Sequence, residues 1–266
     1  MDLPLPAERH RRIQEFLLEH RAVRVSTLAE LLGVSEVTVR RDLEDLERRG
    51  LLERTHGGAI LAQRMGREPL YIEAASRHPV EKQRIGAAAA RLATDGDTVF
   101  LNGGTTTLEV VRHLGAHVRV VTNHVGAALE AGDRGMDLIL VGGEYRFPSN
   151  SCVGELATRT LRGIFATRSF IGVEGLSLLS GLTTPALAEA EIARVMIEQT
   201  RGPVVVVADS SKVGTVADFS IAPIDAATIL VTDRGLDDEY RGELTDLGVR
   251  VVVADDVIVL PTSAPG

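Results

Sequence analysis

The stretch STLAELLGVSEVTVRRDLEDL, residues 26–46, decides how the first part of this chain folds. Two short runs with apolar residues at helical spacing meet at Gly33. We expect the hydroxyl of Ser26 to cap the first helix and that of Ser35 to cap the second. Gly33 suits the end of the first helix, because glycine adopts a left-handed backbone conformation without strain. The pattern predicts two helices joined by a tight turn.

A further helix is expected at about residues 8–20, where apolar side chains again recur at helical spacing. The helix after Ser35 is expected to run to about residue 49 and to end at Gly50. At about 100° per residue, its core-facing residues are Val39, Leu43 and Leu46. Its outer sector and the flanks of that sector hold Val37, Thr38, Arg40, Arg41 and Glu44.

This outer sector has the chemistry of a surface that reads DNA. Arginine makes paired hydrogen bonds to guanine, and an exposed valine can touch a thymine methyl group. A second helix docked in the major groove is the helix-turn-helix mode of binding. Residues 51–60 predict two extended runs around a turn, which would form a wing with Arg54 and His56 near the sugar-phosphate backbone. Ser26 and Ser35, at the starts of the two helices, are further candidate DNA contacts.

The charge of residues 1–60, which form the N-terminal head, limits the kind of DNA binding to expect. Residues 1–60 hold ten basic and eleven acidic side chains, so the head is not a strongly electrostatic, non-specific DNA binder. A module that binds another protein through the same outer face remains the alternative. It predicts no specific DNA complex.

The rest of the chain alternates helices with short β-branched runs. Such runs, buried on both faces, predict a mainly parallel sheet in an α/β domain. The expected strands are residues 98–101, 118–121, 138–141, 170–173, 204–207, 229–231 and 249–253. We predict a winged helix-turn-helix domain at residues 1–61, a linker at 62–79 and the α/β domain at 80–266.

Several of these strands end at small or polar residues, where open α/β sheets bind ligands. Glycines and hydroxyls at a helix N-terminus make an anion site, although no full P-loop or dinucleotide motif is present. The candidate ligand residues are Asn102, Gly103, Gly104, Thr105, Thr106, Thr122, Asn123, Gly142, Gly143, Arg146, Glu174 and Lys212. Each has a structural alternative: a tight turn, a helix cap, a loop hydrogen bond, a solvated arginine or a lysine paired with Asp209.

The chain resembles the DeoR family of bacterial transcription regulators. The resemblance lies in residues 34–46, the His56-Gly57-Gly58-Ala59 ending of the head, and a series of motifs in the α/β domain. These motifs are residues 95–97, 103–106, 121–123, 141–143, 170–172 and 208–212. The resemblance implies a regulator, most often a repressor, that binds double-stranded operator DNA. It also implies a sensor domain similar to phosphosugar isomerases, bound by a phosphorylated sugar or related metabolite.

Two residues depart from the family pattern. Ala193 stands where many relatives carry lysine, and Asn102 where aspartate is more usual. The rival function is an isomerase-like enzyme with a DNA-binding head, for which Glu174, Glu189, Asp209 and Lys212 are the acid-base candidates. Their spacing shows no convergence, and a shared fold does not confer a reaction. We therefore expect a regulator with no catalytic residues.

Composition favours a cytoplasmic protein. Cys152 is the sole cysteine, so no internal disulfide can form. No apolar run of about 18 residues is present, and the N-terminus lacks the apolar stretch of a secretory signal. We expect no cofactor, no metal ion and no membrane. The resemblance implies a homo-oligomer, either a dimer or a tetramer, that pairs two heads on two half-sites.

Overall fold

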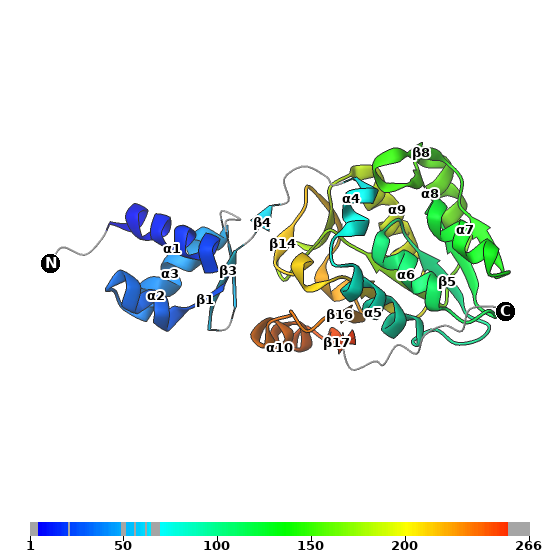
Figure 1. Cartoon of the computed structure of the whole chain (residues 1–266). Coiled ribbons are helices and arrows are strands. Elements are labelled where there is room, and N and C mark those ends of the chain that lie inside the picture. Colours follow the sequence, from blue (N-terminus) through cyan, green and yellow to red (C-terminus); the bar gives the residue numbers. More distant parts are fainter. Residues whose placement is uncertain are drawn as a thin grey trace.

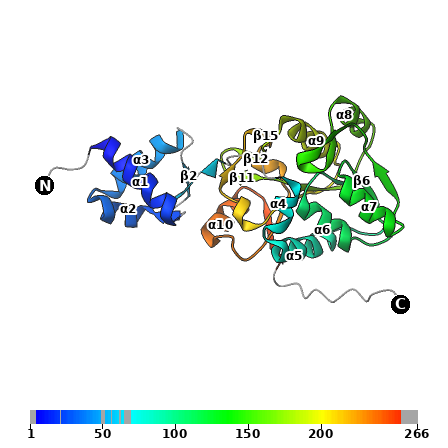
Figure 2. The same cartoon turned by 45° about the horizontal axis from the view of Figure 1, so that its top comes forward.

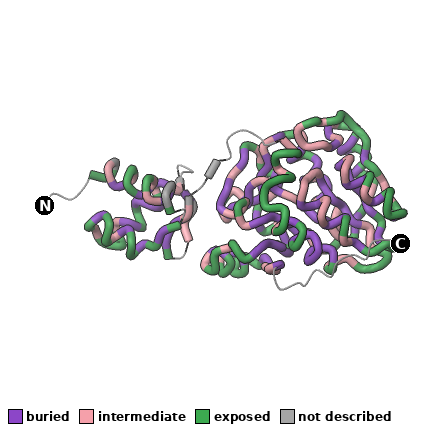
Figure 3. The backbone as a smooth tube through the Cα atoms, viewed as in Figure 1, coloured by how far each residue is buried: buried purple, intermediate pink, exposed green. Residues whose placement is uncertain are grey.

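The computed structural model describes residues 5–20, 22–48, 52–55, 57–61, 63–64 and 70–254. A small N-terminal head lies at one end of the molecule and a larger α/β domain lies at the other (Figure 1). Each has its own buried centre (Figure 3). The structure thus has a head and an α/β domain, and the predicted domain boundaries stay a prediction.

The head is a three-helix unit with a small sheet. Its helices are α1 (Pro6–His20), α2 (Val25–Leu32) and α3 (Glu36–Arg48). Its antiparallel strands lie in the order β1 (Ala22–Arg24), β3 (Gly58–Leu61) and β2 (Leu52–Arg54). The core-facing residues predicted for α3 are all buried, together with Ile13, Leu17 and Leu28. The strands β2 and β3 form the predicted wing.

The start of α2 differs from the prediction. The helix begins at Val25, and Ser26 is its exposed second residue, so Ser26 is not the cap. The reason is β1, which pairs with β3 and holds the chain extended up to Arg24. The first free N–H of the helix, that of Val25, then donates to the carbonyl of Gly57 at 2.7 Å. The wing thus takes the place of a side-chain cap.

The start of α3 follows the prediction. The hydroxyl of Ser35 accepts the backbone N–H of Thr38 at 3.2 Å, which is the expected cap. Gly33 ends α2 in the left-handed conformation, with φ at 66°. Gly50, the expected end of α3, lies outside the described residues.

A buried ion pair joins α1 to α3. The guanidinium of Arg9 donates to both carboxylate oxygens of Asp42, at 2.6 and 2.8 Å. Both side chains are nearly excluded from solvent. The pair fixes how the recognition helix α3 lies on the rest of the head, because a two-point contact restricts rotation as well as distance.

The larger domain is built on a seven-stranded sheet whose neighbouring strands all run parallel. The strands lie in the order β17 (Arg250–Val253), β16 (Ile229–Thr232), β13 (Val204–Val207), β10 (Arg168–Gly172), β5 (Thr98–Leu101), β6 (Arg119–Thr122) and β7 (Leu138–Leu140). Each matches a predicted strand to within about two residues at either end.

Helices cover both faces of this sheet (Figure 2). One face packs against α5 (Pro79–Ala90), α6 (Thr105–His113) and α7 (Val125–Asp133). The other packs against α8 (Glu155–Arg162), α9 (Leu187–Glu198) and α10 (Asp238–Asp246). The β-branched strand residues are therefore buried on both sides, as a parallel sheet requires.

Smaller strands, absent from the prediction, flank the sheet. The hairpin of β8 (Glu144–Arg146) and β9 (Ser151–Val153) leads into α8. A second antiparallel sheet consists of β11 (Gly175–Ser177), β12 (Gly181–Thr184) and β15 (Phe219–Ala222). These strands have three or four residues each, and β15 pairs with β12 from a distant part of the chain, so local patterns give little sign of them.

The predicted linker contains regular structure. Its β4 (Gln63–Arg64) pairs with β14 (Thr215–Val216) of the α/β domain, and its α4 (Tyr71–Ser76) lies against that domain. The carboxylate of Glu239 in α10 also accepts the backbone N–H of Gly57 at 2.8 Å, at the turn of the wing. The head therefore contacts the α/β domain through its wing, and the linker contacts that domain through β4 and α4.

Candidate nucleic-acid interface and ligand pocket

The outer face of α3 is open to solvent. Val37 is 61% exposed, and Arg40, Arg41 and Glu44 are exposed as well. Thr38 lies at the edge of this face and is half-buried. Val37 thus offers an exposed apolar side chain on the same helix face as two arginines. The face presents the groups that base edges in a major groove accept.

Some charged side chains on and beside this face already form ion pairs, and others do not. Arg40 pairs with Glu36 at 3.3 Å on the same helix, and Arg54 of the wing pairs with Glu44 at 3.0 Å. Within the described residues, no hydrogen bond or ion pair involves Arg41. Arg41 is therefore the arginine that can bind a new partner without first breaking a contact.

The other predicted DNA contacts have mixed positions. Ser26 is exposed on α2, where its hydroxyl is not used as a helix cap. The hydroxyl of Ser35 is occupied by its cap and lies 2.9 Å from that of Thr38. His56 lies outside the described residues.

A pocket opens at the carboxyl ends of the central strands of the sheet. The chain passes from β5 outward to β6 and β7, and then returns to β10 on the other side of β5. This reversal of strand order creates a crevice between β5 and β10, where α/β proteins bind their ligands. The pocket is lined by residues that follow three strands: Asn102–Thr106 after β5, Gly172–Glu174 at the end of β10, and Asp209 after β13.

Asn102 ties the two central strands together at this crevice. Its side-chain amide donates to the carbonyl of Gly172 at 2.9 Å, and its side-chain oxygen accepts the N–H of Gly172 at 2.8 Å. A carboxylate would accept the N–H but would repel the carbonyl. The asparagine at this position is therefore matched to its neighbour. The Asn102 side chain lines the pocket, and its amide group already donates to the carbonyl of Gly172.

The N-terminus of α6 forms one wall. Gly103 and Gly104 lead into the helix, and Thr105 and Thr106 are its first residues. Thr107 is fully buried, and its hydroxyl donates to the carbonyls of Asn102 and Gly104. Thr107 thus shapes the loop. The pocket wall is left to Thr105, Thr106 and the free backbone N–H groups of the first turn, which make a site suited to an anion.

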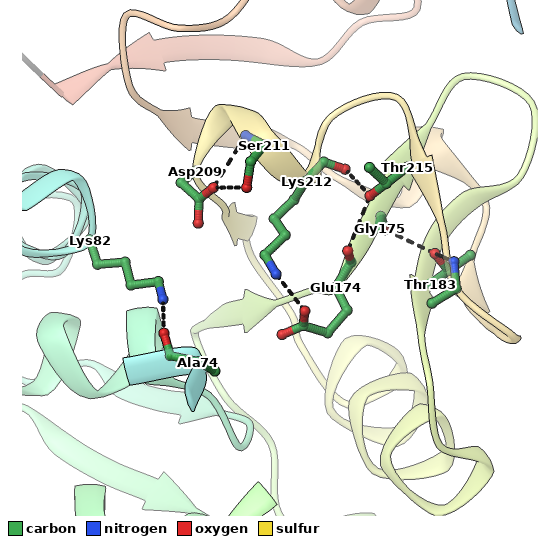
Figure 4. A network of polar contacts seen from close by, with 10 residues as sticks. Ala74, Lys82, Glu174, Gly175, Thr183, Asp209, Ser211, Lys212 and Thr215 are labelled. Atoms are coloured by element: carbon green, nitrogen blue, oxygen red, sulfur yellow. Dashed lines mark hydrogen bonds and ion pairs between the residues drawn. The ribbon is translucent and has the colours of Figure 1, made fainter. Parts of the chain in front are cut away.

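Charged groups from several elements meet around the same pocket (Figure 4). Lys212 pairs with Glu174 at 2.5 Å, and not with Asp209, which accepts the N–H and hydroxyl of Ser211. Glu189 of α9 accepts hydroxyls from Ser149 and Ser151, the latter at 2.7 Å. The four acid-base candidates thus do converge, contrary to the expectation from spacing, but each is held by a protein partner.

Five of the predicted ligand residues do not line the pocket: Thr122, Asn123, Gly142, Gly143 and Arg146. Thr122 and Asn123 are fully buried at the end of β6. They bond the carbonyls of Leu101 and Cys152, so for Asn123 the loop alternative describes its contact. Arg146 lies near Ser149, 3.4 Å from its hydroxyl.

Several pocket residues are missing from the predicted set, and three of them come from segments that precede the sheet. Tyr71 and Ala74 come from the predicted linker, and Lys82 comes from α5. A lysine within an apolar helical run was the available signal for Lys82. Ala193, by contrast, is fully buried in the apolar core and does not line the pocket.

Comparison with protein-family models assigns both parts of the chain. Residues 9–65 match the DeoR-like helix-turn-helix domain, and residues 77–234 match the DeoR C terminal sensor domain. The chain belongs to the DeoR family. It is a DNA-binding transcriptional regulator with a sensor domain.

Relatives match this DeoR-family regulator over nearly their whole length. The regulator GlpR of Haloferax volcanii is 36% identical over 250 residues, which cover 93% of this chain and 98% of the relative. A putative aga operon transcriptional repressor of Escherichia coli O157:H7 is 31% identical, with 94% of both chains covered. FruR of Bacillus subtilis, an HTH-type regulator, is 33% identical over 86% of this chain and 92% of its own. These relatives are named as regulators and not as enzymes.

Similarity to solved structures is weaker. Ribose 5-phosphate isomerase A of Methanocaldococcus jannaschii superposes with a TM-score of 0.37 at 17% identity, over 50% of this chain and 53% of the isomerase. The beta subunit of eIF2B from Chaetomium thermophilum gives a TM-score of 0.41 at 12% identity, over 85% and 77% of the two chains.

None of the helices in the described part of the chain is long and apolar enough to span a bilayer.

Proposed function

We propose that this regulator is a cytoplasmic repressor whose operator affinity is set by a small phosphorylated metabolite, a sugar phosphate or a close relative, bound in the pocket at β5 and β10. One observation carries the proposal. The same chain holds an exposed arginine-bearing face on α3 and a pocket that combines a helix N-terminus with two lysines. A helix N-terminus and ammonium groups together stabilise a phosphate.

Repression is supported by the name of the aga operon relative, which describes that protein as a putative repressor. Control by a metabolite requires that the ligand bind the DNA-competent and DNA-incompetent arrangements with different affinity. A coupling of about 1–3 kcal/mol changes operator affinity roughly 5- to 150-fold. A gel-shift titration of a selected operator duplex, with and without a panel of sugar and polyol phosphates, tests the proposal. A panel that leaves affinity unchanged contradicts it for those compounds.

A homo-oligomer is part of the proposal. Two heads on one assembly would bind two half-sites, and the symmetry of the operator would mirror that of the protein. Sedimentation of the full chain at micromolar concentration measures the assembly, and a strict monomer that binds a palindromic operator as one copy would contradict this part.

Arg41→Ala is expected to weaken operator binding by about 1–3 kcal/mol, or about 5- to 150-fold, if Arg41 reads a base. The variant loses no contact within the described residues, so the folded head keeps its stability. Affinities for the operator and for a random duplex are measured side by side. An equal loss on both duplexes would show that Arg41 contacts a phosphate instead.

The double variant Thr105→Val/Thr106→Val is expected to blunt the effector response by tenfold or more, since it removes two hydroxyl donors of about 1 kcal/mol each. Operator binding without effector should be unchanged, because both residues lie in the sensor domain. Thr160→Val on the exposed side of α8 is the matched control. Loss of operator binding together with the response would indicate misfolding.

A further inference from the structure

Lys82 is a buried ammonium in the wall of the pocket, and its partner belongs to the linker. The residue is only 5% exposed, and its Nζ donates to the backbone carbonyl of Ala74 at 2.5 Å. Figure 4 shows it reaching from α5 to Ala74 of α4, with Asp209 and Lys212 on the other side. Among the described residues, no carboxylate forms an ion pair with Lys82.

This environment leaves Lys82 incompletely satisfied. An ammonium has three donors, and one neutral carbonyl uses one of them. Burial lowers the pKa of Lys82, and the charges of Asp209 and Glu174 oppose that shift. Lys212, by comparison, already pairs with Glu174. Lys82 is thus the pocket ammonium with most to gain from an incoming anion.

The helix that Lys82 holds has few other attachments. α4 has six residues, none of them buried, and a helix this short is not stable by itself. Among the described residues, α4 also packs against α6 and against the short 3-10 helix Phe147–Ser149, and the ring of Tyr71 lies with its centre 5.0 Å from that of His124. Burial lowers the pKa of His124 to about 4, so this contact is uncharged at neutral pH.

The connection from α4 to α5 is also strained. His78 lies between the two helices with φ at 50°, in the left-handed region that residues other than glycine seldom occupy. Such a conformation persists only when surrounding contacts impose it. The bond from Lys82 to Ala74 spans this connection and is one of those contacts.

We propose that Lys82 is a ligand-binding residue that exchanges the Ala74 carbonyl for the anionic group of the effector and thereby releases α4. The inference rests on the proposed function, in which the pocket takes a phosphorylated metabolite. The exchange is favourable because an anion attracts the buried ammonium by its full charge, whereas the neutral carbonyl of Ala74 offers only a dipole. Since α4 lies in the segment between head and sensor, its release removes one of the contacts that tether the head, alongside those of β4 and Glu239.

Hydrogen exchange of the full chain, followed by mass spectrometry, tests this step. Lys82→Met keeps the unbranched stem and removes the ammonium, and Arg91→Met removes a charge from the exposed residue that ends the same helix. Without ligand, we expect amides 71–76 to exchange about five- to tenfold faster in Lys82→Met, from the loss of one hydrogen bond. Arg91→Met should match the wild type.

Inorganic phosphate is the ligand probe, with chloride at equal ionic strength as its control. In the wild type, phosphate should protect amides 103–106 and speed exchange at 71–76, while in Lys82→Met it should do neither at the same concentration. Protection at 103–106 with no change at 71–76 overturns the inference and leaves the pocket standing. No effect of phosphate at either segment overturns both the inference and the anion site. Failure of the wild type to bind any operator duplex is a separate result, which contradicts the proposed function alone.

Discussion

Asp42→Ala is expected to destabilise the head by about 3–5 kcal/mol, because it removes the carboxylate that accepts two hydrogen bonds from the buried guanidinium of Arg9. A domain of this size has only about 5–15 kcal/mol of stability, so much of the head population would unfold near physiological temperature. Urea titration followed by circular dichroism should show an early transition of the head and an unshifted transition of the sensor domain. DNA binding should fall with the folded fraction.

The double variant Arg9→Leu/Asp42→Leu separates a lost charge partner from lost packing. Replacing both members of a buried ion pair by apolar side chains is often neutral or stabilising, so most of the stability should return. A loss below about 1 kcal/mol for Asp42→Ala, or a double variant as unstable as the single one, would show that the Arg9–Asp42 pair does not hold α1 and α3 together.

Local patterns predicted the parts of the fold that local physics determines. The face of α3 follows from helical spacing, and the cap at Ser35 and the turn at Gly33 depend on one or two neighbouring residues. The strand β1 does not, since its three residues become a strand only by pairing with β3. That pairing also needs Gly58, because a Cβ there would lie 2.0 Å from the carbonyl oxygen of Val23.

The pocket was predictable only in part, because strand order decides which loops meet. The strand ends of β5, β10 and β13 lie side by side, so Asn102–Thr106, Glu174 and Lys212 come together as expected. The end of β6 looked equally suitable in the sequence, but β6 lies on the far side of β5 from the crevice. Tyr71 and Lys82 enter from segments with no ligand motif, and only the packing of α4 and α5 brings them to the site.

Val37→Glu is expected to abolish measurable operator binding, with a loss of about a hundredfold or more. The valine is 61% exposed on the face of α3 that carries Arg40 and Arg41. A carboxylate there faces the negative charge of DNA, and like charges brought together at an interface cost several kcal/mol. Glutamate has a higher helix propensity than valine, so the head should be no less stable than the wild type.

Fluorescence anisotropy with a labelled operator duplex measures this loss, and circular dichroism of the same samples shows whether the head is folded. Leu129→Glu, on an exposed position of α7 in the sensor domain, is the matched control and should bind as the wild type does. Because the repulsion comes from the phosphates and base edges alike, binding to random DNA should fall too. If Val37→Glu is folded and binds the operator with unchanged affinity, the outer face of α3 does not enter the duplex, and another surface of the head must bind it.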